Sequence, residues 1–417
     1  MNMNISRRLF LKNGGLAMIG MSTLPVFLQR AIAATPTSSK KKLVVLFQRG
    51  AADGLNIVVP FAEPNYYRIR PTIAIPAPRS GGDQSVVDLD GFFGLHPSMA
   101  SLAPLFHSGS LAMVHAAGSP DSSRSHFDAQ DYMESGTPGV RATDDGWLNR
   151  TMIEMPEPGA SPFRAVAMGA NLPLTLRGVA PAIALPDVSQ FKVFAQSSAV
   201  EGGFEALYAQ TVDTALRGTG NETFAAVDML RKADPAHFQP ENGAQYPSGR
   251  VGQTMLQVAQ LLKADVGMEV SFVDTGGWDN HVNEGGAQGQ LANLLRDLSQ
   301  SLSAFSQDLG DRMEDIVVVT MSEFGRTAHE NGNRGTDHGH ANCMLVMGGP
   351  VKGGKVYGQW PGLNPDQLNE GRDLTLTTDF RSVLGELIVN HLGSKDLDTV
   401  FPGFDNDPKK FRGVLKT

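Results

Sequence analysis

The chain has 417 residues, of which 41% are hydrophobic and 19% are charged, and its formal net charge at pH 7 is −8. This length allows two or three average domains or one large α/β domain, and the hydrophobic content suffices for a sizeable core. The composition excludes fibrous and disordered classes, and the acidic balance disfavours nucleic acid as a partner.

The N-terminus has the three regions of a secretory signal peptide: a basic segment with Arg7 and Arg8, an apolar run, and small residues up to Ala33. The arginine pair resembles the twin-arginine export type. The apolar run is too short and too rich in glycine for a spanning helix, although an uncleaved amphipathic anchor is the alternative. We therefore expect residues 1–33 to be removed after passage through the twin-arginine export machinery. A periplasmic or secreted protein without a stable membrane span would remain.

Removal of residues 1–33 takes away four basic residues and no acidic one, so the net charge becomes −12. A protein this acidic is expected to bind no nucleic acid. Its single cysteine, Cys343, cannot form a disulfide within the chain and lies in an apolar run, which predicts a buried thiol.

Strand-like and helix-like segments alternate after a linker over residues 34–42. We expect strands at 43–47, 111–116, 163–169, 268–273, 316–321 and 341–349. We expect helices within 96–110 and at 125–134, 146–155, 204–216, 248–265 and 291–309. A last helix is expected within 376–393, with Thr378 or Asp379 near its N-cap and Gly393 as its stop.

This alternation predicts an α/β fold with a mostly parallel central sheet and helices on both faces. We expect residues 43–417 to form a single domain, with an irregular insertion around 146–250 to which no chemistry can be assigned. In such sheets, ligands bind beyond the carboxyl ends of the strands.

Carboxylate and imidazole groups gather after three of the expected strands. The stretch from Thr320 to Gly349 is the richest of these segments. It holds Glu323, His329, Asp337, His338 and His340. A second segment supplies Asp274, Asp279 and His281, and a third, residues 122–127, supplies serines, Arg124 and His126.

Buried carboxylates and imidazoles are costly to hold together without a cation, and a divalent metal is the usual solution. In an extended segment residues two apart share a face, so Asp279 with His281, and His338 with His340, can each bind one ion. We expect one or two divalent ions. Zinc is the ion that we expect most, and manganese and iron are the next candidates. Calcium fits a mixed set of oxygen and imidazole donors least well.

The motifs SRRLFLK, RGAADGLN, SSRSHFDAQDYMESG, GGWDNH, SEFGRT and GTDHGHAN together resemble the bacterial family called domain of unknown function 1501. This family is grouped with the alkaline phosphatase and sulfatase superfamily. The resemblance covers the whole chain after the signal peptide and implies an alkaline phosphatase-like fold.

The resemblance also implies roles for individual residues. It makes Ser125 the nucleophile, Asp53 the metal ligand after the first strand, and Asp279 and His281 the middle ligand pair. Glu323 and either His338 or His340 complete the implied ligand set. The sequence departs from the superfamily pattern at SEFG, where Phe324 stands in place of a ligand histidine and puts two-metal chemistry in doubt.

These residues predict an exported, metal-dependent hydrolase that acts on a small anionic phosphate or sulfate ester. Ser125 would attack the ester, Arg124 would hold a non-bridging oxygen, and His126 lies beside the nucleophile. The metal ligands would come from Asp53, Asp279, His281, Glu323, Asp337, His338 and His340. The alternative is a catalytically degenerate member of the family that serves as a periplasmic binding or assembly factor.

Several of these residues also have an ordinary structural explanation. Ser125 is followed three residues later by Asp128, so it can act only as a helix N-cap. Asp53 lies between glycines and can be a turn residue, and His126 can simply flank a helix start. A serine hydrolase of the nucleophile-elbow type is disfavoured because the chain has no GxSxG motif.

Overall fold

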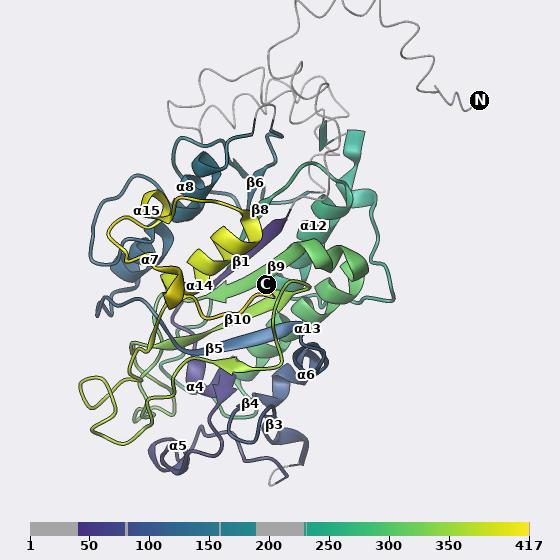
Figure 1. Cartoon of the computed structure of the whole chain (residues 1–417). Helices are drawn as coiled ribbons and strands as arrows, with labels where there is room; N and C mark the ends of the chain where they lie inside the picture. The colour runs from purple at the N-terminus through teal and green to yellow at the C-terminus, as the bar shows by residue number, and fades with distance from the viewer. Residues whose placement is uncertain (1–40, 80–81, 158–159, 189–228, 231, 417) are drawn as a thin grey trace, which may run out of the picture.

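The computed structural model of the chain describes residues 41–79, 82–157, 160–188, 229–230 and 232–416. Figure 1 shows it with the element labels that are used below. The expected signal peptide over 1–33, nearly all of the expected linker and the helix expected at 204–216 lie outside the described residues. Within them, no helix is long and apolar enough to cross a membrane.

A nine-stranded sheet forms the centre of the fold. Its strands lie in the order β11-β5-β10-β9-β1-β8-β6-β7, and β12 also pairs with β5. All neighbours pair in parallel except β10, which is antiparallel to both β5 and β9. The strands are β1 (Lys42–Gln48), β5 (Leu111–Gly118), β6 (Ala165–Met168), β7 (Ile183–Ala184), β8 (Val270–Thr275), β9 (Ile316–Met321), β10 (Asn342–Gly348), β11 (Val356–Tyr357) and β12 (Thr378–Asp379). The expected α/β fold with a mostly parallel sheet is confirmed.

The α-helices connect these strands, and short 3-10 turns lie between them. The α-helices are α4 (Gly54–Ile57), α5 (Pro64–Ile69), α6 (Ala103–His107), α7 (His126–Ser135), α8 (Trp147–Glu154), α12 (Arg250–Lys263), α13 (Gln290–Leu309), α14 (Phe380–Glu386) and α15 (Leu397–Val400). The 3-10 turns are η2 (Gly82–Gln84), η3 (Pro97–Leu102), η4 (Leu174–Leu176), η6 (Pro235–His237), η7 (Gly310–Asp315) and η9 (Pro408–Lys410).

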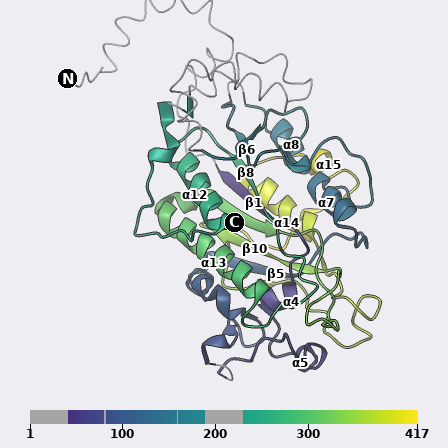
Figure 2. The same ribbon diagram turned by 180° about the vertical axis from the view of Figure 1, so that it is seen from behind.

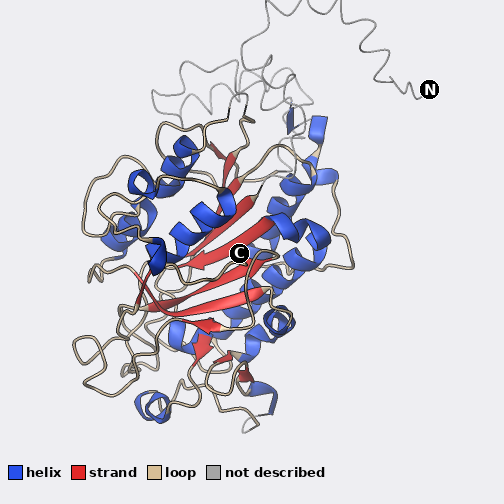
Figure 3. Ribbon diagram, viewed as in Figure 1, coloured by secondary structure: helices blue, strands red, loops and turns tan. Residues whose placement is uncertain are grey.

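Helices cover both faces of the sheet, as Figure 3 shows. In β1, Val44 and Leu46 pack into one core with α12 and α13, whereas Leu43, Val45 and Phe47 pack into a second core with α8 and α14. Figure 1 shows α14 in front of the sheet, and Figure 2 shows α12 and α13 in front from the opposite side. Because successive side chains of a strand point to opposite faces, β1 is buried on both sides, which explains its uninterrupted apolar sequence.

Two of the expected helices have a different form in the structure. The helix expected within 96–110 is divided into the 3-10 turn η3 and the short helix α6. Pro104 explains the division, because it lacks a backbone N–H and its ring clashes with the carbonyl four residues earlier. The C-terminal helix begins after Asp379, whose side chain caps it, and ends at Gly393 as expected. Its last part, η8 (Leu387–Leu392), is a π-helix.

A small antiparallel sheet lies beside the first helices. It has the order β2-β4-β3, with β2 (Val58–Val59), β3 (Val87–Asp88) and β4 (Gly94–Leu95). The tight turns of the Pro- and Gly-rich region 71–94 therefore produce a short hairpin between β3 and β4.

Candidate metal centre

The candidate residues come to one edge of the sheet because of strand direction. Strands β1, β5, β8 and β9 all run the same way, so the loops that follow them emerge at the same edge. The antiparallel strand β10 begins at this edge, so the histidines that precede it also lie there. The chain thereby brings together segments that are far apart in sequence, such as Gly50 and Glu323, which are 273 residues apart.

Three side chains form a group that can hold a metal ion: His126, Asp279 and His338, whose ligand atoms lie within 4.8 Å of one another. His281 joins them, because its Nε2 lies 3.0 Å from Asp279 Oδ1 and 3.0 Å from His338 Nε2. His338 Nε2 is 3.3 Å from Asp279 Oδ1, and His126 Nε2 is 3.5 Å from Asp279 Oδ2. Ligand atoms on a tetrahedral zinc with bonds of about 2.0–2.1 Å lie roughly 3.3 Å apart, which is close to these four pair distances.

A second layer of contacts holds each of the three imidazoles. Every Nδ1 atom lies within hydrogen-bond distance of an oxygen acceptor: 2.8 Å from Glu323 Oε1 for His126, 2.9 Å from Asp337 Oδ1 for His281, and 2.8 Å from the Arg124 carbonyl oxygen for His338. These acceptors place the proton on Nδ1 and leave the Nε2 lone pair free, which is how metal-binding histidines are usually held. The buried His126 Nε2 has no hydrogen-bond partner among the described residues.

The charges around the group favour ionised carboxylates. Burial alone would raise the pKa of Asp279, but the hydrogen bond and positive charge of Arg326, at 2.8 Å from Oδ1, bring it below its ordinary value. The pKa of Glu323 is likewise lowered against burial, chiefly by hydrogen bonds from His126 and Gln130. The same hydrogen bond raises the pKa of His126, whereas burial lowers the pKa of His338.

The structure does not bring Asp53 into this group. Both of its carboxylate oxygens receive hydrogen bonds from the buried Arg70, at 2.5 Å and 2.9 Å. Burial would raise the pKa of Asp53, but the Arg70 guanidinium outweighs it and lowers that pKa. Asp53 lies outside the group whose ligand atoms are within 4.8 Å of one another, so we do not count it as a ligand. Among the described residues only one group of three candidate ligands occurs, which favours one ion over two.

Glu323 and Asp337 lie behind the histidines. Glu323 Oε1 accepts hydrogen bonds from Gly50 N and Gln130 Nε2 as well as from His126, so this oxygen is fully engaged. His340, expected beside His338, instead donates from Nε2 to the carbonyl oxygen of Ser119 at 3.0 Å. These three predicted ligands therefore do not converge with the others.

Ser125 and Arg124, two of the residues expected to act in catalysis, both have structural contacts of their own. Ser125 is the N-cap of α7, and its hydroxyl accepts the N–H of Asp128 at 3.5 Å. Arg124 forms ion pairs with Asp373 and Glu370, at 2.6 Å and 2.7 Å, so its guanidinium is committed to these carboxylates.

The sequence analysis did not identify Arg326. It gave His126 a catalytic role, although its ring lies in the candidate metal-binding group. The signal for Arg326 was its position within SEFGRT, as the first basic residue after the strand. For His126, the signal was Gln130, one helical turn later, because both side chains reach Glu323.

Phe324 fills the place next to the imidazoles. Its ring centroid lies 5.0 Å from that of His126 at an interplanar angle of 27°, and 5.1 Å from that of His338. With 3% of its surface exposed, it shields one side of the group from water.

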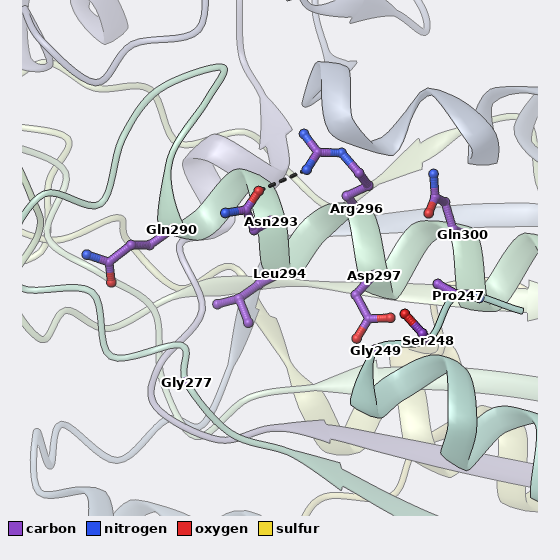
Figure 4. Close-up of a pocket in the computed structure, with 10 residues that line it drawn as sticks. All are labelled: Pro247, Ser248, Gly249, Gly277, Gln290, Asn293, Leu294, Arg296, Asp297 and Gln300. Carbon is purple, nitrogen blue, oxygen red and sulfur yellow. Dashed lines mark hydrogen bonds between the residues drawn. The ribbon is translucent and has the colours of Figure 1, made fainter.

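An open pocket lies between the start of α12 and the first turns of α13 (Figure 4). Polar side chains of α13 line it, among them Asn293 and Arg296, which are joined by a hydrogen bond of 2.9 Å. None of the candidate metal ligands lines this pocket, although Gly277 lies two residues before Asp279. It is therefore distinct from the group that can hold a metal.

A sequence model of the family described as "Protein of unknown function (DUF1501)" matches residues 40–394. Among curated proteins, none matches the chain.

Several solved structures are similar to the chain at low identity. Ps i-CgsB in complex with k-i-k-neocarrahexaose is 10% identical with a TM-score of 0.42, over 90% of this chain and 78% of that chain. The PsFucS1 sulfatase from Pseudoalteromonas sp. is 12% identical with a TM-score of 0.39, over 94% and 76%. The alkaline phosphatase from the Antarctic bacterium TAB5 is 9% identical with a TM-score of 0.30, over 75% and 93%. Likenesses this weak carry no argument about the activity of the chain.

Proposed function

The chain belongs to the DUF1501 family of proteins of unknown function, and we propose that this member is a metal-dependent hydrolase of phosphate or sulfate esters. The metal would be a single divalent ion, zinc first, held by Asp279, His126, His281 and His338.

One observation carries this proposal. Three imidazole Nε2 atoms point at the carboxylate of Asp279, and an acceptor on the far side of each ring fixes the tautomer that leaves Nε2 unprotonated. Histidines that serve only packing do not need three such matched pairs. A mixed set of nitrogen and oxygen donors suits zinc, manganese or iron.

Each nearby residue has a defined part in the proposed reaction. A divalent ion held by these residues would supply Lewis-acid chemistry for an ester oxygen. Arg326 holds Asp279 in place, and Phe324 keeps water from one side of the imidazoles. Ser125, immediately before His126, is the proposed nucleophile. Its oxygen would form a bond to phosphorus or sulfur as the bond to the leaving oxygen breaks, the departing alcohol would take up the proton, and water would then release the acid and restore the serine.

Metal analysis and ester assays test the proposal together. We expect protein purified without chelators to contain about one equivalent of zinc, manganese or iron, and to hydrolyse an aryl phosphate or aryl sulfate. His338→Ala should lose the metal and the activity, whereas Ser125→Ala should keep the metal and lose the activity.

His340→Ala is the matched control, because this histidine lies two residues away in the same loop but binds a carbonyl oxygen. It should keep the metal content. Absence of a transition metal from the unmodified protein would refute the metal centre, and full activity in Ser125→Ala would refute the proposed nucleophile.

Phe324 favours the second candidate, a degenerate protein that keeps the site for binding or assembly in the periplasm. Its ring stacks on His126 where the superfamily pattern has a histidine, so an aromatic wall replaces a nitrogen ligand. Phe324→His separates the two functions. A large gain in ester hydrolysis would indicate a decayed catalytic site, and no change or a loss would show that the native ligand set differs.

Export by the twin-arginine machinery is part of the proposal. Replacement of Arg7 and Arg8 by lysine should leave the protein in the cytoplasm, whereas the unmodified protein should reach the periplasm or the medium. Cell fractionation measures the difference, and an unchanged distribution would contradict this route.

A further inference from the structure

A buried chain of hydrogen bonds leads from Asp279 into the interior. Arg326 donates from Nη1 to Asp279 Oδ1 at 2.8 Å and from Nε to Thr336 Oγ1 at 3.1 Å. The Thr336 hydroxyl donates to Glu284 Oε2 at 2.7 Å. At most 2% of Arg326, Thr336 and Glu284 is exposed, so water cannot replace these contacts.

At the inner end of this chain, Glu284 lies beside the ion pair of Asp53 and Arg70. Both carboxylate oxygens of Asp53 are bound to Arg70. Glu284 Oε1 has no N–H or hydroxyl partner among the described residues. Burial raises the pKa of Glu284 well above its usual range, and the negative charge of Asp53 raises it further.

The balance of buried charges also indicates that Glu284 is protonated. The groups that face Glu284 include one cation, Arg70, and one anion, Asp53, which balance each other. Arg326 is already committed to Asp279. An ionised Glu284 would add a buried negative charge without a cation of its own, which is costly in the interior of a protein.

We propose that Glu284 is the neutral acid, with its proton shared with Asp53, and that Glu284 and Thr336 are positioning residues that hold Arg326 against Asp279. The donors then run in one direction, from Arg326 to Thr336, from Thr336 to Glu284, and from Glu284 to Asp53. This inference rests on the proposed metal centre, since its consequence is the orientation of the ligand Asp279. None of the positioning residues touches the metal or the substrate.

Zinc titration of metal-free variants tests the inference. Thr336→Val removes the hydroxyl at nearly constant volume and should weaken zinc binding by about 10- to 100-fold, the usual cost of losing a partner behind a metal ligand. Thr336→Ser should restore the affinity. Glu284→Gln should bind zinc within about twofold of the unmodified protein, because the neutral amide can donate to Asp53 and accept from Thr336.

Glu386→Gln provides the matched control for a buried glutamate. Glu386 is 1% exposed and accepts the backbone N–H groups of Gly413 and Leu415, and it takes no part in the chain described above. This variant should lower the urea midpoint of unfolding and leave zinc affinity unchanged. A change in zinc affinity therefore separates positioning from general destabilisation.

The outcomes distinguish the inference from the proposed function. If the unmodified protein binds no zinc, manganese or iron, both fail. If it binds zinc and Thr336→Val binds equally well, the positioning role is wrong and the metal centre stands. A loss in Glu284→Gln as large as that in Thr336→Val would show that Glu284 is ionised. If Thr336→Val does not fold, Arg326→Lys takes its place in the zinc titration. An unchanged zinc affinity of Arg326→Lys would overturn the inference.

Discussion

Glu323 lies behind the candidate metal ligands rather than among them. The sequence places it in a metal-binding stretch, but its Oε1 receives donors from Gly50, Gln130 and His126. These contacts keep the carboxylate ionised and fix the ring of His126 from behind. In the proposed metal centre, Glu323 would therefore act on the metal only through His126.

Replacement of this carboxylate by an amide tests that role. In Glu323→Gln, the pKa of His126 should fall, because its hydrogen bond to Glu323 is the main cause that raises it. Zinc affinity should fall by about 10- to 100-fold. NMR titration of the imidazole in metal-free protein and zinc titration measure the two effects. Glu330→Gln, whose carboxylate accepts the N–H groups of Thr72 and Ile73, is the control. An unchanged pKa of His126 would contradict the assignment.

At the scale of elements, two loops at the edge of the sheet are packed backbone against backbone. Gly50, in the loop after β1, has φ of +118°, and a Cβ atom built there would lie 2.6 Å from the backbone nitrogen of Asp279. The loop after β8, which carries Asp279 and His281, therefore depends on a glycine in a different loop. Strand pairing sets this contact, since β1 and β8 are neighbours in register.

Gly50→Ala should consequently destabilise the protein and disturb the metal-binding group. The positive φ alone costs an alanine about 1–3 kcal/mol, and the close approach to Asp279 adds a displacement of the ligand loop. Urea unfolding and zinc titration should both show a loss. Gly169→Ala is the control, because a Cβ atom there meets nothing within 4 Å and its φ is not positive. Normal zinc affinity in Gly50→Ala would refute the coupling of the loops.

At the scale of the whole molecule, two buried histidines should make stability depend on pH. Burial lowers the pKa of His96 and His115 to about 4. In the unfolded chain they titrate near 6.5, so between pH 6.5 and 4 the unfolded state binds more protons than the folded state. Stability is therefore lost as pH falls through this window, by about 2 kcal/mol for each histidine between pH 7 and pH 5.

Urea unfolding of metal-free protein at several pH values measures this slope. The raised pKa of His126 has the opposite sign, because its contribution is present at low pH and is lost as pH rises through that pKa. His115→Gln should flatten the loss between pH 7 and pH 5, whereas the exposed His107→Gln should not. Equal slopes in all three proteins would contradict the prediction.

The main elements and the class of the fold could be predicted from the sequence. Continuous apolar runs predicted strands β1, β5, β8, β9 and β10, because strands buried on both faces need apolar residues throughout. Capping residues predicted both ends of the C-terminal helix. The Asp379 side chain accepts a backbone N–H at the first turn, and Gly393 adopts the left-handed conformation that ends the helix, so both act within a few residues of the chain. The loops that follow parallel strands also identified Asp279, His281 and His338, which the structure brings together.

The pairing of charged side chains could not be predicted from the sequence and follows from the folded structure. Arg70 lies 17 residues from Asp53, and Arg326 lies 47 residues from Asp279, so no local pattern links either pair. Hydrogen bonds and charges act over a few ångströms, and the folded chain alone sets which groups come that close. In the folded chain, Asp53 pairs with Arg70 instead of the candidate ligands. Glu323 and Asp337 bind the Nδ1 atoms of His126 and His281 from behind, and His126 Nε2 lies beside Asp279.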